Sequence, residues 1–267
     1  MDPGAASVFV RFFTEVDVFL LILVRILGFF IILPVFSAAN IPGQVRVAFA
    51  VVVSYLLFVS GNIVMAEYND TIGAYVLMIV KEFIVGFATG FVVNLIFSVF
   101  FLVGQMIDFK IGFAMVSIVD PLSQIQVPIT GNLLYMLVAM LLVASGGLNA
   151  FIAAFFYSYH VIPLGSVVIL SNPVLSVYIV EVMTNFLTLG IRFAMPVIGA
   201  IMIVDVALGV LVKATPQMNF FVVGMPIKLF LGLFVFTLII PLLGTIYDYV
   251  FNEAYRHLIN VMDGMAP

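Results

Sequence analysis

Long apolar runs, separated by short stretches of polar and turn-forming residues, make up most of the chain. The runs lie near residues 17–39, 45–66, 72–107, 127–160, 174–212 and 220–250. About 20 apolar residues of helix are enough to cross the hydrocarbon core of a bilayer. The pattern therefore predicts six hydrophobic blocks, each long enough to span a membrane.

These runs are expected to be helices rather than the strands of a membrane barrel. Barrel strands alternate apolar and polar residues over about ten positions, whereas the apolar residues here follow one another without alternation. Helices and closed barrels are the two structures that satisfy every backbone hydrogen bond inside a bilayer. We therefore expect an all-α, multi-pass integral membrane protein built from long helical hairpins.

Polar residues, glycines and prolines gather where the connections are expected. These stretches are 40–46, 67–71, 108–126, 163–173 and 213–219. The third, fourth and fifth runs are longer than one span requires, and their candidate breaks are Lys81–Glu82, Gly146–Gly147 and Pro196, respectively. We expect these runs to form hairpins or kinked helices.

Composition agrees with a membrane protein. The chain of 267 residues is 65% hydrophobic and 8% charged, which lies outside the usual range of soluble domains. No Asp, Glu, Lys or Arg occurs between Pro121 and Val180, and a soluble fold could not keep so long a stretch away from its surface. Lipid or partner subunits are expected to cover it.

Charge and residue usage argue against several classes of function. A net charge of −4 with nine Lys and Arg leaves no basic patch for a nucleic acid. The chain has no Cys, and His160 and His257 are far apart in the sequence, so no metal, cofactor or catalytic site is expected. Residues 1–7 contain Asp2 and no cation, which is unlike a cleaved signal peptide, so we expect the amino terminus to be retained.

Among the ionisable residues inside the apolar runs, Arg25, Glu181, Arg192, Asp205 and Lys228 are the candidates for a functional role. Such groups are costly in a membrane. One interpretation is that each meets a partner on a neighbouring helix or reaches an interface with its flexible side chain. The alternative is a secondary transporter for a small molecule, in which Glu181 or Asp205 takes part in uptake.

Two glycines four residues apart, Gly86 and Gly90, occur in the sequence GFATG. Small residues at this spacing lie on one face of a helix and let a second helix approach closely. Asn94 and Ser98 continue the same spacing. The stripe indicates a helix–helix contact rather than a ligand site.

A short apolar segment, DFKIGFAMVSIVDP, lies between Asp108 and the pair Asp120–Pro121. It contains Phe113, Met115 and Ile118 and is too short to cross a membrane. A re-entrant loop buried in protein and a surface loop with a few exposed apolar residues both fit this composition.

The sequence TPQMNFFVVGMP at 215–226 lies at the junction between the last two apolar runs. Pro216 is expected to end the preceding helix, and Gln217 and Asn219 to satisfy free backbone groups. Gly224 and Pro226 would permit a sharp return, with Pro226 in the first turn of the next helix. Lys228 then lies near a helix amino terminus, where a cation is unfavourable, so we expect an acidic or carbonyl partner for it elsewhere.

Taken together, these motifs resemble the FliR/SctT family of flagellar and type III secretion export gates. The resemblance runs over nearly the whole chain. It is carried by Arg25 with GFFIILPVFSAANIPGQVRVAFA, then KEFIVGFATG, GQMIDFKIGFAMVSIVDP, HVIPLGS and PQMNFFVVGMPIKLFLG. Two departures are Gly146-Gly147-Leu148-Asn149, where the family often has Gly-His, and Lys213, where an Arg is common.

The resemblance implies a non-enzymatic core subunit of the flagellar export gate in the bacterial inner membrane, within the basal body. In this family one copy joins FliP and FliQ in a helical assembly that contacts FlhB and FlhA and encloses a pore for unfolded flagellar proteins. It also implies a FliP-like part, about 1–212, followed by a FliQ-like hairpin, about 213–267. The alternative is the corresponding subunit of a virulence injectisome.

The resemblance also implies roles for individual residues. Phe113, Met115 and Ile118 become residues of a loop that plugs the closed pore, where apolar side chains exclude water and ions by dewetting. The implied assembly contacts are Gly86, Gly90, Asp120, Pro121, Pro216, Gln217, Asn219, Gly224, Pro226 and Lys228.

Overall fold

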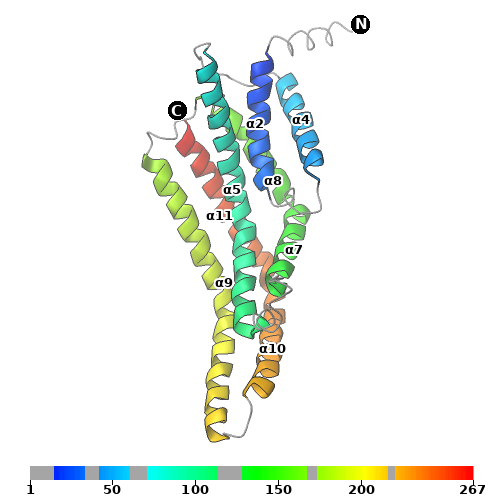
Figure 1. Ribbon diagram of the computed structural model, residues 1–267, viewed down its shortest axis with the longest axis vertical. Coiled ribbons are helices and arrows are strands. Elements are labelled where there is room, and N and C mark those ends of the chain that lie inside the picture. The colour runs from blue at the N-terminus through cyan, green and yellow to red at the C-terminus, as the bar shows by residue number, and fades with distance from the viewer. Residues whose placement is uncertain are drawn as a thin grey trace. The chain divides into compact units, whose positions relative to one another are not determined.

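The computed structural model describes residues 15–33, 42–60, 71–113, 128–166, 173–215 and 220–266. Within these ranges the chain is mainly helical and forms no β-strand (Figure 1). In chain order the elements are α2 (Val16–Ile32), α4 (Gly43–Ser60), α5 (Ile72–Ile111), α7 (Ile129–Ala144), α8 (Gly147–Val161), α9 (Pro173–Ala214), α10 (Phe220–Ile239), the 3-10 turn η2 (Ile240–Leu242) and α11 (Leu243–Met265). The predicted all-α class is confirmed.

The chain folds into two units that interleave along the sequence. Unit 1 comprises Met1–Leu95, Gly146–Val182 and Glu253–Pro267, and unit 2 comprises Ile96–Ser145 and Met183–Asn252. Helices α5, α9 and α11 each begin in one unit and end in the other. The division at residue 212 into FliP-like and FliQ-like parts stays a prediction.

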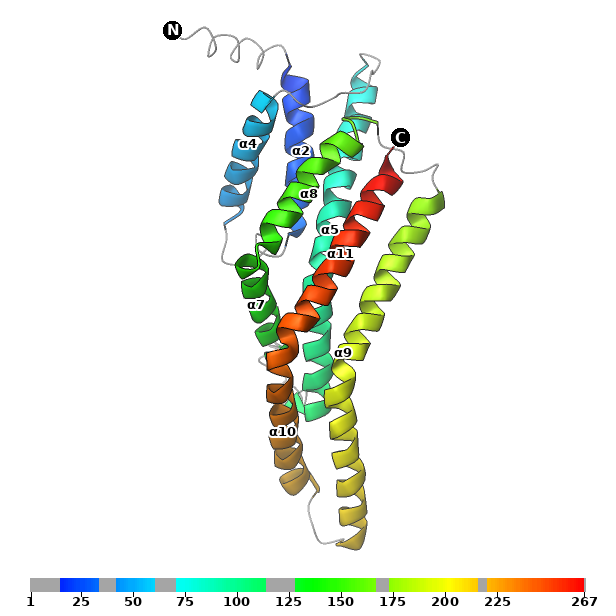
Figure 2. The same ribbon diagram turned by 180° about the vertical axis from the view of Figure 1, so that it is seen from behind.

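In unit 1, α2 lies between α4 and the first part of α5 (Figures 1 and 2). Helix α4 buries a narrow stripe formed by Ala50, Ser54 and Phe58, which are four residues apart and so share one face. Val52 and Leu56, on its other faces, are exposed. Helix α4 is thus apolar all round but packed on one side, as expected for a helix that lipid or another subunit covers.

Aromatic side chains join α2 to its neighbours in unit 1. Phe29 stacks on Phe155 of α8 with ring centroids 4.2 Å apart. Phe30 meets Phe49 of α4 edge-on, with centroids 5.3 Å apart. Offset and edge-on arrangements are the favourable ones for aromatic rings, so these pairs fix α2 against two helices.

In unit 2 the second part of α5 packs closely against other helices. Gly104 of α5 and Gly131 of α7 touch through their backbones, where a Cβ on Gly104 would overlap the neighbouring residue. Gly190 of α9 lies against the same part of α5, and Gly232 of α10 lies against Ile111. Small residues therefore let α7, α9 and α10 approach α5 in this unit.

The predicted breaks inside the long runs had different outcomes. The chain does break at Gly146, which has a φ of +74° between α7 and α8, as favoured for glycine. The predicted break at Lys81–Glu82 is wrong, because α5 runs through it without interruption and Glu82 finds a buried partner. Pro196 also lies inside a continuous helix, α9.

Helix α11 extends beyond the predicted end of the last apolar run, from residue 250 to Met265. Val250, Ala254, Leu258 and Val261 are buried at intervals of three and four residues, while charged side chains occupy other faces. A search for continuous apolar runs misses such an amphipathic helix, because its signal is the periodicity.

Among the described residues, four helices are long and apolar enough to cross a membrane, or five if α7 and α8 form one broken span. Helices α5 and α9 contain 40 and 42 residues. At about 1.5 Å per residue they are roughly 60 Å long, about twice the thickness of a bilayer core. Each therefore has far more length than one crossing requires.

Candidate functional site

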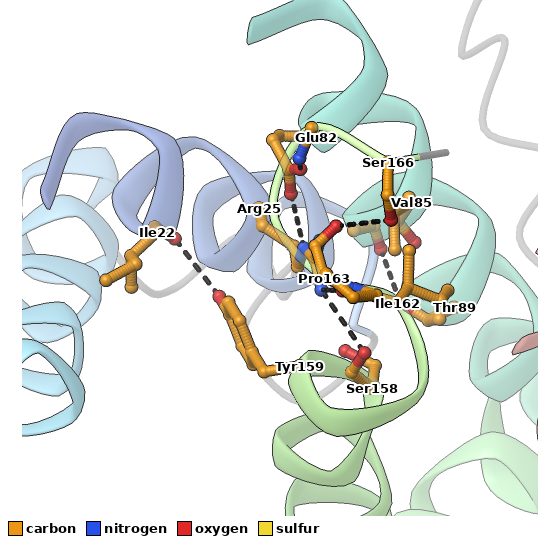
Figure 3. A network of polar contacts seen from close by, with 12 residues as sticks. Ile22, Arg25, Glu82, Val85, Thr89, Ser158, Tyr159, Ile162, Pro163 and Ser166 are labelled. Carbon is orange, nitrogen blue, oxygen red and sulfur yellow. Dashed lines mark hydrogen bonds and ion pairs between the residues drawn. The ribbon is translucent and has the colours of Figure 1, made fainter. Parts of the chain in front are cut away.

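A buried ion pair between Arg25 of α2 and Glu82 of α5 forms the centre of unit 1 (Figure 3). The Arg25 Nε donates to Glu82 Oε2 at 2.5 Å, and both side chains are fully buried. Two charges removed from water are tolerated when each faces the other and the remaining polar atoms are hydrogen-bonded.

Further hydrogen bonds connect this pair to the end of α8. Arg25 Nη1 donates to the backbone oxygens of Ile162, at 3.0 Å, and of Ser158, at 3.4 Å. Carbonyls at a helix carboxyl end carry partial negative charge, so a guanidinium suits this position. The other carboxylate oxygen, Glu82 Oε1, accepts from Gly165 N at 2.7 Å. The pair thus links α2, α5 and the turn after α8.

Tyr159 of α8 completes the environment of Arg25. The guanidinium carbon lies 4.4 Å from the centroid of the Tyr159 ring, within the range of a cation–π interaction. The Tyr159 hydroxyl donates to the backbone oxygen of Ile22 at 3.2 Å, and Figure 3 shows this ring reaching from α8 to α2. Tyr159 therefore supports the charge with its ring and holds α2 with its hydroxyl.

The predicted close approach at GFATG is confirmed, and it occurs within the chain. A Cβ on Gly86 would collide with the backbone oxygen of Arg25, and a Cβ on Gly90 would lie 2.8 Å from the backbone oxygen of Phe29. On the other side, a Cβ on Gly28 would lie 2.8 Å from the backbone oxygen of Phe83. Glycines on both helices bring α2 and α5 into backbone contact beside the ion pair.

A second polar contact joins the two helices that flank residues 114–127, in unit 2. Both carboxylate oxygens of Asp108 on α5 accept from Thr130 N at the start of α7, at 3.1 and 3.2 Å. Pro128 precedes α7 and provides no side-chain cap, so Asp108 acts in its place. A carboxylate also suits the positive end of a helix dipole.

Helix α5 ends just beyond Asp108. Gly112 has a φ of +102° and its N–H donates to the backbone oxygen of Asp108 at 3.2 Å, as at many helix carboxyl ends. Phe113 follows and is half-buried. Asp108 thus ties together the two positions at which the chain leaves α5 and enters α7.

Replacing Asp108 with Ala is expected to destabilise unit 2 by about 1–3 kcal/mol, because the buried Thr130 N–H loses its acceptor. Asp108→Asn keeps one acceptor oxygen and should destabilise unit 2 less than Asp108→Ala does. Thermal unfolding of the purified protein measures both changes, with the exposed acid Asp248→Ala as the control. Equal melting temperatures for all three variants would contradict the capping role.

Lys228 was expected to have an acidic or carbonyl partner elsewhere, and the structure shows an acid on another helix. Lys228 of α10 forms an ion pair with Asp205 of α9 in unit 2, so the prediction of a partner elsewhere is confirmed for this residue. The prediction that Pro226 lies in the first turn of its helix is wrong. Helix α10 already begins at Phe220, and Pro226 lies inside it, because the apolar residues before the proline continue the helix.

The other predicted site residues are not brought together by the structure. Glu181 and Arg192 are both exposed on α9, and Gly224 is buried in α10. Met115, Ile118, Asp120, Pro121, Pro216, Gln217 and Asn219 lie outside the described residues. In the part of the chain that the structure describes, no three His, Asp or Glu side chains gather as metal ligands would.

Sequence reasoning did not identify Glu82, Tyr159 or Asp108 as functional positions. The available signal for Glu82 was that a carboxylate inside an apolar run needs a cation, just as Arg25 needs an anion. Arg25 and Glu82 are 57 residues apart in the sequence, so no local pattern joins them.

The chain matches the model of the bacterial export proteins, family 1, over residues 16–254. It is 24% identical over 245 residues to the flagellar biosynthetic protein FliR of Bacillus subtilis, which covers 91% of this chain and 94% of that protein. It is 29% identical over 232 residues to the surface presentation of antigens protein SpaR of Shigella flexneri, covering 84% and 86%. It is also 28% identical over 253 residues to the Yop proteins translocation protein T of Yersinia pestis, covering 92% of each.

Proposed function

Because the chain belongs to the bacterial export proteins of family 1, we propose that it is a non-enzymatic core subunit of the flagellar type III protein export gate. It joins homologues of FliP and FliQ in the bacterial inner membrane, contacts FlhB and FlhA, and encloses part of the pore for unfolded flagellar proteins. The observation that carries the proposal is the family match across residues 16–254, from α2 into α11.

The construction of the molecule supports a structural role. Arg25 and Glu82, both fully buried, neutralise one another and hold three segments together. Many large apolar side chains on α4, α9 and α10 are exposed, and exposed apolar surface of this extent is typical of contact with lipid or with other subunits. A subunit of a membrane assembly has both properties.

Co-expression with the FliP and FliQ homologues from the same organism tests the proposal. A gate subunit should be extracted from the membrane in a complex of defined mass that contains all three proteins. If the chain is instead purified alone and takes up a small molecule in vesicles, the secondary-transporter alternative replaces the gate. Loss of that uptake in Glu181→Gln or Asp205→Asn would support the transporter further.

We also propose that the segment after Gly112 plugs the closed pore, with Phe113, Met115 and Ile118 as its sealing side chains. Asp108 and Gly112 support this proposal, since they fix where the chain leaves α5 and enters α7. Apolar side chains seal against ions by excluding water and can part for a polypeptide.

Replacing Phe113, Met115 and Ile118 together with Gly is expected to make the assembled gate leak ions while the complex still forms. The removal of three apolar side chains lets water enter the constriction. Ion flux across vesicles that contain the purified complex measures the leak. The matched control replaces three exposed apolar residues of α4 with Gly, and equal leak from both complexes would reject the plug.

A second candidate is the corresponding subunit of a virulence injectisome. It is favoured by identities of 29% to SpaR and 28% to the Yop translocation protein, against 24% to the FliR of Bacillus subtilis. Deletion of the gene separates the two. Loss of motility and flagellar filaments supports the flagellar gate, whereas retained motility with loss of effector secretion supports the injectisome.

The junction between α9 and α10 is proposed as a contact with other subunits. Pro216, Gln217, Asn219, Gly224, Pro226 and Lys228 belong to it by resemblance. Gly224 is buried and Lys228 pairs with Asp205, which supports a fixed geometry at the start of α10. Asp120 and Pro121 are proposed as assembly contacts on the same basis of resemblance.

A further inference from the structure

The second half of α9 and the whole of α10 belong to unit 2 and run antiparallel beside one another (Figures 1 and 2). We propose that the ion pair between Asp205 and Lys228 fixes the register of these two helices. The register is the choice of which turn of α10 lies level with which turn of α9. This role lies within the chain, so the inference goes beyond the proposed function and does not require it.

Two contacts define the observed register. A Cβ on Gly232 of α10 would lie 3.5 Å from the Cδ1 atom of Ile201 on α9, and Lys228 pairs with Asp205. Asp205 is four residues after Ile201, and Lys228 is four residues before Gly232. The two contacts therefore belong to one antiparallel arrangement and are about one helical turn apart.

The two charges lie in line with buried residues rather than on the outer faces of the helices. On α10, Gly232 and Phe236 are buried, and Lys228 continues their four-residue spacing and is half-buried. On α9, Ile201 is buried and Asp205, one turn later, is half-buried. The ion pair is thus part of the surface along which α9 and α10 pack.

The apolar residues of α10 do not select this register by themselves. Lys228 is the single charged residue of α10, which otherwise has no side chain more polar than that of Thr237. After a slip of one turn, aliphatic and aromatic side chains would again face α9. The same slip would bring Lys228 level with Ile201 or Gly209 in place of Asp205. An ammonium without its carboxylate is costly between apolar helices, so the charge discriminates where apolar packing does not.

No second acid on α9 could replace Asp205 in another register. Asp205 is the single acidic residue of α9 within unit 2, so one position of α10 gives Lys228 a carboxylate on that helix. A polar residue in the packed surface of a coiled coil fixes register in the same way, at some cost in stability. Here the two halves of the device are on two helices of one chain.

The distance between two spin labels tests the register directly. The chain has no Cys, so Val210→Cys and Phe234→Cys introduce the two label sites, both at exposed positions. In the observed register Phe234 lies level with Gly199, which is about 16 Å from Val210 along the helix axis. A slip of one turn should therefore change the distance between the labels by about 5 Å. The full chain is purified in detergent for this measurement by double electron–electron resonance.

The unaltered pair should give one narrow distance distribution. Replacing both charges, Asp205→Leu with Lys228→Leu, should add a second population shifted by about 5 Å, because slipped registers no longer leave a charge unpaired. The exchanged pair, Asp205→Lys with Lys228→Asp, should restore the single distance. Lys213→Leu removes an exposed charge from the same helix and, as the matched control, should leave the distribution unchanged.

One narrow distance in the double Leu variant would overturn the inference, because packing alone would then set the register. A second population in the exchanged pair would overturn it as well, since opposite charges would not restore the register. If the double Leu variant does not accumulate, the exchanged pair decides, with a single native distance in favour and a second distance against. These measurements use the chain alone, so failure of the proposed gate function would show separately, in the co-expression experiment.

Discussion

Replacing Arg25 with Ala is expected to lower the free energy of unfolding by about 3–5 kcal/mol, the range for removing one partner of a buried ion pair. The substitution leaves the Glu82 carboxylate fully buried without its cation. It also frees the backbone oxygen of Ile162, which now accepts from Arg25 at 3.0 Å. Denaturant unfolding of the purified protein in detergent measures the loss.

The control for this prediction removes both charges together. The double variant Arg25→Met with Glu82→Met should be considerably more stable than Arg25→Ala, because apolar replacement of a whole buried pair is often close to neutral. If the single and double variants lose the same stability, the loss comes from packing around Arg25 and not from an uncompensated carboxylate.

Replacing Gly86 with Ala is expected to destabilise unit 1 by about 1–3 kcal/mol, the usual cost of overpacking a tight contact. The new methyl group would collide with the backbone oxygen of Arg25, and a backbone atom cannot move aside by changing rotamer. Helix α2 would have to shift, which also disturbs the adjoining ion pair. The same unfolding measurement reports the change.

Gly73→Ala provides the matched control for Gly86→Ala. Gly73 is on the same helix, but a Cβ there meets nothing within 4 Å. The stability of the Gly73→Ala variant should therefore equal or slightly exceed that of the unaltered protein. The assignment of close packing at Gly86 would fail if both variants unfolded at the same denaturant concentration.

The sequence was sufficient for those features that depend on neighbouring residues. Apolar runs locate most of the helices, because continuous burial or lipid contact is recorded locally along the chain. The small-xxx-small spacing at Gly86 and Gly90 correctly indicated a close helix contact. The dipole argument at Lys228 correctly required a partner, although it did not identify Asp205.

The features that were missed depend on tertiary structure. Lys81–Glu82 was interpreted as a break because two charged residues interrupt an over-long apolar run, but α2 contributes Arg25 as the partner of Glu82 and α5 continues. Asp108 caps a helix that begins more than twenty residues later, so no local capping pattern records it. Pro226 was placed in a first helical turn because proline is tolerated there and Gly224 nearby would permit a sharp return, yet the preceding apolar residues extend α10 around it.

The separation of Arg25 from its partner also determines the order of events at the ribosome. At about 5–20 residues per second, the 57 residues between Arg25 and Glu82 take roughly 3–11 s to synthesise. During that interval Arg25 lacks its carboxylate partner, and the carbonyl group of Ile162 that also accepts from it is made later still. The buried pair therefore forms only after Glu82 has been translated, and its full set of hydrogen bonds only after Ile162.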